Sequence, residues 1–325
     1  MAVKIGVIGV GVHGLHHVRL LSSMNDVEFK GVFDNNAEVC REVAGEFSTT
    51  PYYSVDHMLD EVDGVTVAVP TSSHRDVVIH SLESGVSVLV EKPISVNLQE
   101  ADEMISVADK NNLVLSVGHL ERYNPAYRSV STGDALAPKF IESHRLSVFN
   151  PRGTDVAVVL DLMIHDIDVV LDMVKEPVKS VHAVGVAVVT DEIDIANARL
   201  EFEGGCVANL TASRISQRKM RKIRMFRKNA YISMDFLTGE SEVFKLKDGA
   251  RPSLEAGTLP QVMDGISYRK YPNDGLNALG LEIEDFVTAV RDGVVPRVSG
   301  SDGRKALEVA STIMNTMEVS ARSFQ

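Results

Sequence analysis

The chain has 325 residues, of which 44 % are hydrophobic and 24 % are charged, a balance that is ordinary for a globular protein. This length exceeds one ordinary domain and suits two, each with its own core. The formal net charge of −12 argues against nucleic acid and against an anionic membrane as the main partner. No apolar run is long enough to span a bilayer, and the first predicted strand begins near the amino terminus. We therefore expect neither a membrane anchor nor a signal peptide.

The chain contains two cysteines, Cys40 and Cys206, which lie far apart in the sequence. They predict neither a disulfide framework nor a cysteine metal site. This cysteine usage favours the reducing cytoplasm as the location of the protein.

The first 118 residues alternate between strand-like and helical patterns. Short apolar runs, typical of buried strands, lie at 4–8, 28–33, 64–69, 86–90 and 114–118, and helical patterns lie at 14–24, 37–47, 74–84 and 98–111. This spacing is that of βαβ units, which build a parallel sheet covered on both faces. We expect a doubly wound, Rossmann-type α/β domain over residues 1–120, with its ligand at the carboxyl ends of the strands.

A GxGxxG motif follows the first predicted strand and opens the first predicted helix. Its three glycines suit a tight turn, a close approach to a pyrophosphate and close helix packing, and the helix N-terminus offers N–H groups to phosphates. Asp34, at the end of the second strand, can accept hydrogen bonds from a ribose 2′-OH and would repel a 2′-phosphate, so NAD is preferred to NADP. The predicted cofactor contacts in this region are Gly9, Gly11, Val12, His13, Gly14 and Asp34.

From about residue 140 the pattern changes to successive strands without crossover helices. Strand-like runs lie at 140–149, 180–189, 196–202, 207–213, 221–226 and 231–236, and helical patterns lie at 158–174, 278–291 and 301–320. These runs predict a mostly antiparallel sheet, with a hairpin at Gly204-Gly205 and a helix cap at Ser301. Residues 248–264 have the composition of an irregular loop. We expect residues 121–325 to form an α+β domain for substrate binding and oligomerisation.

Lys92 lies in Glu91-Lys92-Pro93, at the end of the fourth predicted strand. A cation at the carboxyl end of a Rossmann strand can stabilise a developing alkoxide, and a following proline restricts the backbone. From position alone, Lys92 is equally consistent with a solvated lysine in a turn.

Asp161 and His165 lie four residues apart in the predicted helix 158–174, so their side chains share one face. Asp168 and Asp172 continue that face, whereas Asp166 lies off it. The pattern fits either a solvated polar stripe or a histidine base beside a carboxylate, aimed at a hydroxyl group.

The Glu91-Lys92-Pro93 segment, in this context, resembles the signature of the Gfo/Idh/MocA family of sugar oxidoreductases. The resemblance covers essentially the whole chain and includes matches at 69–74, 161–166 and 301–303. It implies a Rossmann domain, an α+β second domain and NAD-dependent oxidation of a sugar hydroxyl without a metal. The implied catalytic residues are Lys92, Asp161 and His165, and the implied further cofactor contacts are Thr71, His74, Glu91 and Lys92.

The segment from Gly118 to Ala126, Gly-His-Leu-Glu-Arg-Tyr-Asn-Pro-Ala, resembles that of family members acting on UDP-N-acetylhexosamines. Tyr123 departs from the usual phenylalanine but keeps an aromatic ring. The resemblance implies oxidation at C3 of a sugar such as UDP-N-acetylglucosamine, preparing it for transamination towards lipid A precursors. The implied substrate contacts are Lys92, His119, Arg122, Tyr123, Asn124, Asp161 and His165. Read without the resemblance, the segment is an ordinary helix start with Pro125 in its first turn.

Two other functions remain open: a dehydrogenase of a free sugar or cyclitol, of the inositol type, and a non-catalytic NAD-binding regulator of the same fold.

The run 214–228 holds eight basic residues. It is a solvated strand face, a surface that pairs with acids across a subunit interface, or a contact for a substrate diphosphate. The long sheet of the second domain, as in family relatives, predicts a homodimer or homotetramer.

Overall fold

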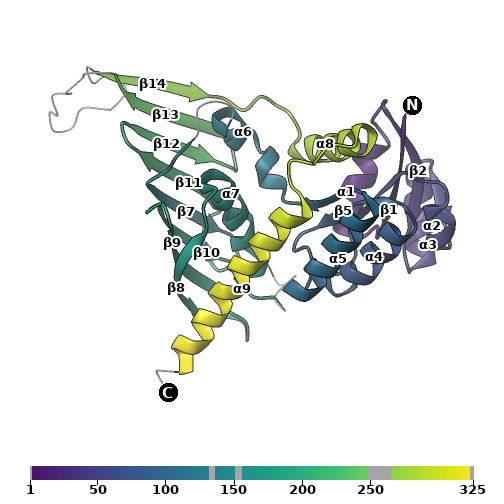
Figure 1. The fold of residues 1–325 in the computed structure, drawn as a ribbon, viewed down its shortest axis with the longest axis horizontal. Helices are drawn as coiled ribbons and strands as arrows, with labels where there is room; N and C mark the ends of the chain where they lie inside the picture. Colours follow the sequence, from purple (N-terminus) through teal and green to yellow (C-terminus); the bar gives the residue numbers. More distant parts are fainter. Residues whose placement is uncertain (1, 132–135, 151–155, 248–264, 323–325) are drawn as a thin grey trace. The chain divides into compact units, whose positions relative to one another are not determined.

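The structure is a computed structural model that describes residues 2–131, 136–150, 156–247 and 265–322, with side chains described as far as residue 317. The predicted loop at 248–264 lies outside the described residues. The chain forms two compact units, drawn in Figure 1. The first comprises Met1–Leu120 and Asn277–Leu307, and the second comprises Glu121–Leu276 and Glu308–Gln325. The functional division at residue 120 stays a prediction; by packing, residues 277–307 belong with the amino-terminal part.

The first unit contains a six-stranded parallel sheet in the order β3-β2-β1-β4-β5-β6. This is the strand order of a doubly wound dinucleotide-binding fold, as the sequence predicts. The strands are β1 Val3–Ile8, β2 Val27–Phe33, β3 Thr50–Tyr52, β4 Gly64–Val67, β5 Ser87–Glu91 and β6 Leu115–Gly118. The intervening helices are α1 Val12–Leu21, α2 Ala37–Glu46, α3 Val55–Leu59, η1 Thr71–Ser73, α4 His74–Glu83 and α5 Leu98–Asn111. Strand β3 and helix α3 are too short to leave a periodic signal.

The core of this unit includes residues from near the end of the chain. Helix α8, Ala278–Asp292, contributes Ile283, Phe286 and Val287 to the cluster that contains Ile5 and Leu89. The chain therefore returns to cover the amino-terminal sheet.

Helix α9, Gly300–Arg322, begins with a different cap from the one predicted. The Ser299 Oγ accepts a hydrogen bond from the Asp302 N–H at 3.3 Å, and the Asp302 carboxylate accepts one from the Ser299 N–H at 3.0 Å. This reciprocal pair is a capping box. Ser301 already lies inside the helix and cannot be its cap, so that prediction is wrong.

The second unit contains an eight-stranded sheet in the order β14-β13-β12-β11-β7-β10-β9-β8. The strands are β7 Phe140–Leu146, β8 Val178–Val186, β9 Ile195–Phe202, β10 Val207–Ser213, β11 Met220–Arg227, β12 Ala230–Asp235, β13 Glu240–Leu246 and β14 Ile266–Tyr271. Neighbouring strands are antiparallel except β7 and β10, which confirms the mostly antiparallel sheet. Gly205, with φ of +80°, lies in the predicted hairpin between β9 and β10. Strands β13 and β14 are not predicted from the sequence, and their residues are largely half-buried or exposed.

Helices pack on the face of this sheet that carries the buried side chains of Ile141, Ile223 and Met225. They are η2 Leu120–Tyr123, α6 Pro125–Ser131, the π-helical segment η3 Val159–Met163 and α7 Ile164–Val174. The predicted helix 158–174 is therefore present, but it begins with a π-helical turn. Among the described residues, no helix combines the length and apolarity that a bilayer crossing requires.

Candidate active site

The glycine motif forms the turn between β1 and α1. The space that a Cβ atom would meet differs at each of its three glycines. Gly9 has φ of +86°, and a Cβ there would lie 2.8 Å from the Ala68 carbonyl oxygen. A Cβ on Gly14 would overlap the Gly9 carbonyl oxygen. A Cβ on Gly11 would meet no atom within 4 Å. No side chain caps the N-terminus of α1, and its first turn holds no acidic residue. The open space at Gly11 and the uncapped N–H groups fit a bound pyrophosphate.

This contrast gives a prediction for two alanine variants. Gly14→Ala should lower the melting temperature, because overpacking a tight contact typically costs about 1–3 kcal/mol. Gly11→Ala should leave the melting temperature unchanged but weaken NADH binding at least tenfold, or about 1.4 kcal/mol, since its methyl group would occupy the phosphate space. Thermal melts and fluorescence titration with NADH measure both effects. Equal loss of stability in both variants would contradict the assignment.

Asp34 joins the second strand to the glycine turn. Its Oδ2 accepts a hydrogen bond from the Val10 N–H at 2.9 Å, and its Oδ1 accepts one from the Asn36 N–H at 2.9 Å. A carboxylate has roughly four lone-pair positions. The half-buried side chain of Asp34 therefore keeps acceptor capacity for the two ribose hydroxyls after binding the backbone.

His74 links two strand ends. Its Nδ1 lies 3.0 Å from the Pro93 carbonyl oxygen, and its Nε2 lies 3.0 Å from the Val69 carbonyl oxygen. Burial lowers the pKa of His74, and the carbonyl contacts offset only part of that effect. The ring thus braces the turn after β5 against the tip of β4. Its predicted contact with the cofactor stays a prediction.

The other predicted residues of the first unit also follow strand ends. Thr71 begins η1 after β4, Glu91 is the last residue of β5, and His119 follows β6 and is buried. Lys92 is half-buried and precedes Pro93 through a cis peptide bond. Since parallel strands end at one edge of a sheet, the unit brings these residues to the same edge as the glycine turn.

In the second unit, Asp161 lies in the π-helical segment η3 and His165 lies at the start of α7. Both side chains are half-buried. The wider π turn changes the rotation of Asp161 about the helix axis relative to the regular α-helix predicted from sequence. Such π turns occur frequently at functional sites.

Arg122 is buried and its guanidinium is bound by two carboxylates of α7. Its Nε and Nη2 donate to Asp168 at 2.8 and 2.7 Å, and its Nη1 lies 3.2 Å from an Asp172 oxygen. The Tyr127 hydroxyl donates to the other Asp172 oxygen at 2.5 Å. Arg122 therefore binds the helix face that also carries His165. The two carboxylates that it contacts, Asp168 and Asp172, lie one and two turns after His165.

A second arginine grips α7 from another side. The buried Arg145 donates to Asp166 through Nε at 2.9 Å and Nη2 at 2.6 Å, and to Glu121 through Nη1 at 2.8 Å. Burial by itself would lower the pKa of Arg145, but the carboxylates of Asp166 and Glu121 raise it well above its ordinary value. Ser143 adds a hydrogen bond to Asp166 at 2.7 Å.

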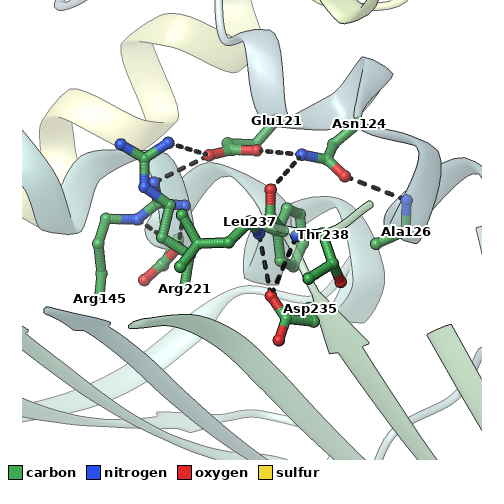
Figure 2. A network of polar contacts seen from close by, with 10 residues as sticks. Glu121, Asn124, Ala126, Arg145, Arg221, Asp235, Leu237 and Thr238 are labelled. Atoms are coloured by element: carbon green, nitrogen blue, oxygen red, sulfur yellow. Dashed lines mark hydrogen bonds and ion pairs between the residues drawn. The ribbon is translucent and has the colours of Figure 1, made fainter. Parts of the chain in front are cut away.

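Figure 2 shows how Glu121 joins this network to the segment that follows it. One of its oxygens faces Arg145 and, at 3.8 Å, Arg221; the other accepts from the Asn124 amide at 2.9 Å. The Asn124 amide also donates to the Phe236 carbonyl at 3.1 Å, and its oxygen accepts from the Ala126 N–H at 3.1 Å. Three of the four hydrogen-bonding positions of the Asn124 side chain are thus used inside the unit.

Three of the predicted substrate contacts lie in the segment that begins with η2, and the structure shows them inside the protein. Arg122, Tyr123 and Asn124 are buried, and the polar groups of Arg122 and Asn124 bind the protein itself. Their contact with substrate stays a prediction. Arg145 is not among the predicted functional residues, although its spacing from Ile141 marks it as an inward-facing position of β7. Asp166, which the sequence places off the face of Asp161 and His165, is likewise assigned no role there.

The basic run pairs with acids where the structure assigns partners on the sheet. Lys222 lies 3.2 Å from Asp235 on β12, and Arg224 lies 3.5 Å from Glu142 on β7. Both acids belong to the same chain, and the side chains of Lys222 and Arg224 are 46 % and 43 % exposed, which fits the solvated strand face among the alternatives.

Comparisons with known proteins decide the family. Residues 3–119 match the oxidoreductase family with an NAD-binding Rossmann fold, and residues 135–232 match the GFO/IDH/MocA C-terminal domain. UDP-N-acetylglucosamine 3-dehydrogenase from Acidithiobacillus ferrooxidans is 37 % identical to this protein. The alignment covers 97 % of this chain and 97 % of the length of that enzyme. The chain belongs to the Gfo/Idh/MocA family.

Two further similarities agree with this assignment. A solved structure of the Acidithiobacillus ferrooxidans enzyme has a TM-score of 0.89 and 35 % identity, covering 98 % of this chain and 99 % of that one. Myo-inositol 2-dehydrogenase from Thermotoga maritima is 26 % identical over 97 % of this chain and 96 % of its own. As a Gfo/Idh/MocA oxidoreductase, the protein uses NAD, which confirms the cofactor predicted from the glycine motif.

Proposed function

We propose that this protein is an NAD-dependent dehydrogenase that oxidises the C3 hydroxyl of a UDP-N-acetylhexosamine such as UDP-N-acetylglucosamine. The observation that carries the proposal is the similarity to UDP-N-acetylglucosamine 3-dehydrogenase, which extends over almost the full length of both chains at 37 % identity. The keto product would be suited to transamination, as in the supply of lipid A precursors.

The proposed chemistry assigns one role to each catalytic residue. His165 removes the proton from the sugar hydroxyl, Lys92 stabilises the oxygen as negative charge develops on it, and Asp161 orients the sugar or His165. Bound NAD supplies the acceptor for the hydride that leaves the same carbon. The predicted contacts at His119, Arg122, Tyr123 and Asn124 form part of the same proposal. No metal is required, since a lysine and a histidine provide the charge stabilisation and the proton transfer.

The test is incubation of the purified protein with UDP-N-acetylglucosamine and NAD. The expected result is formation of NADH together with a sugar nucleotide that has lost the mass of two hydrogen atoms. The Lys92→Ala variant, run in parallel, should form neither product. Failure of the wild-type protein to convert any UDP-N-acetylhexosamine, while it still binds NADH, would overturn the proposal.

The similarity to myo-inositol 2-dehydrogenase favours a second candidate, a dehydrogenase of free cyclitols or sugars. Myo-inositol and free N-acetylglucosamine are therefore included as substrates. Turnover of either with an efficiency equal to that of the UDP-sugar would select this candidate. Failure with every sugar tested would select the third, a non-catalytic NAD-binding regulator.

We also propose that the protein is a cytoplasmic homodimer or homotetramer that associates through the open face of the eight-stranded sheet. The location is supported by Cys40 and Cys206, which are both free and buried. The association is supported by an aromatic row across five strands, on the face opposite Ile223 and Met225. Consecutive ring centroids are 5.9, 5.0, 5.6 and 4.9 Å apart in the order Phe140, Phe226, Tyr231, Phe244 and Tyr268.

A substitution in this row should disrupt the association. Phe226 is 36 % exposed at the middle of the sheet, and a carboxylate there would be buried without a partner in an interface. We expect Phe226→Glu to lower the molar mass measured by light scattering to that of one chain. The control is Val295→Glu, at a residue that is 83 % exposed in the other unit. An unchanged mass for Phe226→Glu would exclude this face as the interface.

A further inference from the structure

His17 is a buried residue of α1 that the proposed chemistry does not use. Its side chain is 2 % exposed, and its Nε2 lies 3.1 Å from the Glu91 Oε1 at the end of β5. The same helix begins at the glycine turn, and Glu91 directly precedes Lys92. The contact therefore connects the helix that receives the pyrophosphate with the strand end that carries the lysine.

Glu91 occupies a closely packed position. Its Oε2 accepts a hydrogen bond from the Lys92 N–H at 3.2 Å. A Cβ on the facing Gly118 would lie 3.2 Å from that oxygen, so any larger residue there would require the carboxylate to shift by a few tenths of an ångström. Burial raises the pKa of Glu91, but the hydrogen bond from His17 and the charges of His13 and Lys92 outweigh it and lower the pKa below its ordinary value. The carboxylate is therefore ionised and accepts both hydrogen bonds.

The other ring nitrogen of His17 defines the proton's position. Within the described part of the chain, the buried Nδ1 has no hydrogen-bond partner. A proton on Nδ1 would place an N–H donor in the core without an acceptor, whereas an unprotonated Nδ1 leaves only an unused lone pair. The ring therefore carries its proton on Nε2, and this Nε2–H group donates a hydrogen bond to Glu91.

We propose that His17 is a positioning residue: its Nε2–H group holds the Glu91 carboxylate, which in turn holds the backbone of Lys92 in place. This inference rests on the proposed function only in taking Lys92 as the residue that contacts the reacting oxygen. His17 itself acts through Glu91 and takes no proton from the substrate. The expected cost of losing it is a misplaced lysine rather than a lost binding contact.

The test compares two substitutions that differ in where they place a donor. In His17→Gln the amide nitrogen reaches the place of Nε2, whereas in His17→Asn the shorter side chain does not. We expect His17→Asn to lower kcat by roughly 10- to 100-fold with little change in the KM for the sugar nucleotide. His17→Gln should restore most of the loss. His16→Gln, at the exposed neighbour on the same helix, is the matched control and should behave as the wild type.

Two readouts do not depend on turnover. Long-range ¹H–¹⁵N correlation spectra of the wild-type protein should show the Nε2–H tautomer for His17, and thermal melts should show that both variants are folded. An Nδ1–H tautomer, or equal kcat losses in the folded Gln and Asn variants, would overturn the inference. Absence of turnover in the wild-type protein would instead count against the proposed function, while the tautomer would still test the role of His17.

Discussion

His165→Ala is expected to lower kcat by roughly 10²–10⁴-fold, the usual loss when a well-placed acid–base group is removed. The side chain is half-buried at the start of α7, so its removal leaves the buried arginine contacts of that helix in place. Melting temperature and NADH affinity should therefore remain near the wild-type values. Steady-state kinetics with UDP-N-acetylglucosamine and NAD measure the effect.

The control for this variant is His57→Ala, at an exposed histidine of α3. It should retain wild-type turnover, which would show that removing a histidine side chain is not harmful in itself. Turnover by His165→Ala within a few-fold of the wild type would remove His165 from the proposed base role. Asp161 would then become the remaining candidate on that helix.

Arg145→Met is expected to destabilise the protein by about 3–5 kcal/mol, because it leaves Asp166 and Glu121 as buried carboxylates without their main partner. The side chains of Arg145 and Asp166 are each 3 % exposed. Urea unfolding of the wild type and the variant measures the change in unfolding free energy. Activity should fall as well, since α7 loses one of the two arginines that hold it.

Two further variants make this prediction specific. Arg291→Met removes the same type of side chain from α8, but the side chain of Arg291 is 41 % exposed and its Nε lies 2.9 Å from Asp292, so the unfolding free energy should change little. Arg145→Met combined with Asp166→Leu should be less destabilised than the sum of the single variants, by about 0.5–3 kcal/mol. Equal losses for Arg145→Met and Arg291→Met would show that the buried network is not a major source of stability.

The buried hydrogen-bond network of the second unit gives residues of the segment Gly118–Ala126 a structural role. The resemblance implied substrate contacts for Arg122 and Asn124, yet the described contacts of their polar groups lie within the unit. Sequence cannot distinguish an arginine that binds a diphosphate from one that binds Asp168, because both uses need the same guanidinium. In a variant of Arg122 or Asn124, a rise in the KM for the UDP-sugar would identify a binding role for the replaced residue. A fall in kcat alone would identify a positioning role.

Local patterns explain what could be predicted correctly. The glycine motif, the alternation of strands and helices and the hairpin at Gly204-Gly205 each depend on residues close together in the chain. The errors are also local in origin. The sequence predicts a helix cap at Ser301, whereas Ser299 forms the capping box with Asp302. Strands β13 and β14 were missed, because strands with few fully buried residues leave little hydrophobic alternation.

The sequence by itself determined the Rossmann fold, the NAD cofactor and the family, since short-range spacing and whole-chain similarity carry that information. Only the tertiary structure decided that Arg122 binds Asp168, 46 residues away, that Arg145 binds Asp166, and that His17 binds Glu91, 74 residues away. It also placed α8 in the amino-terminal core. The physical reason is that a buried charge needs a partner, but many residues could supply it, and only the folded chain selects one.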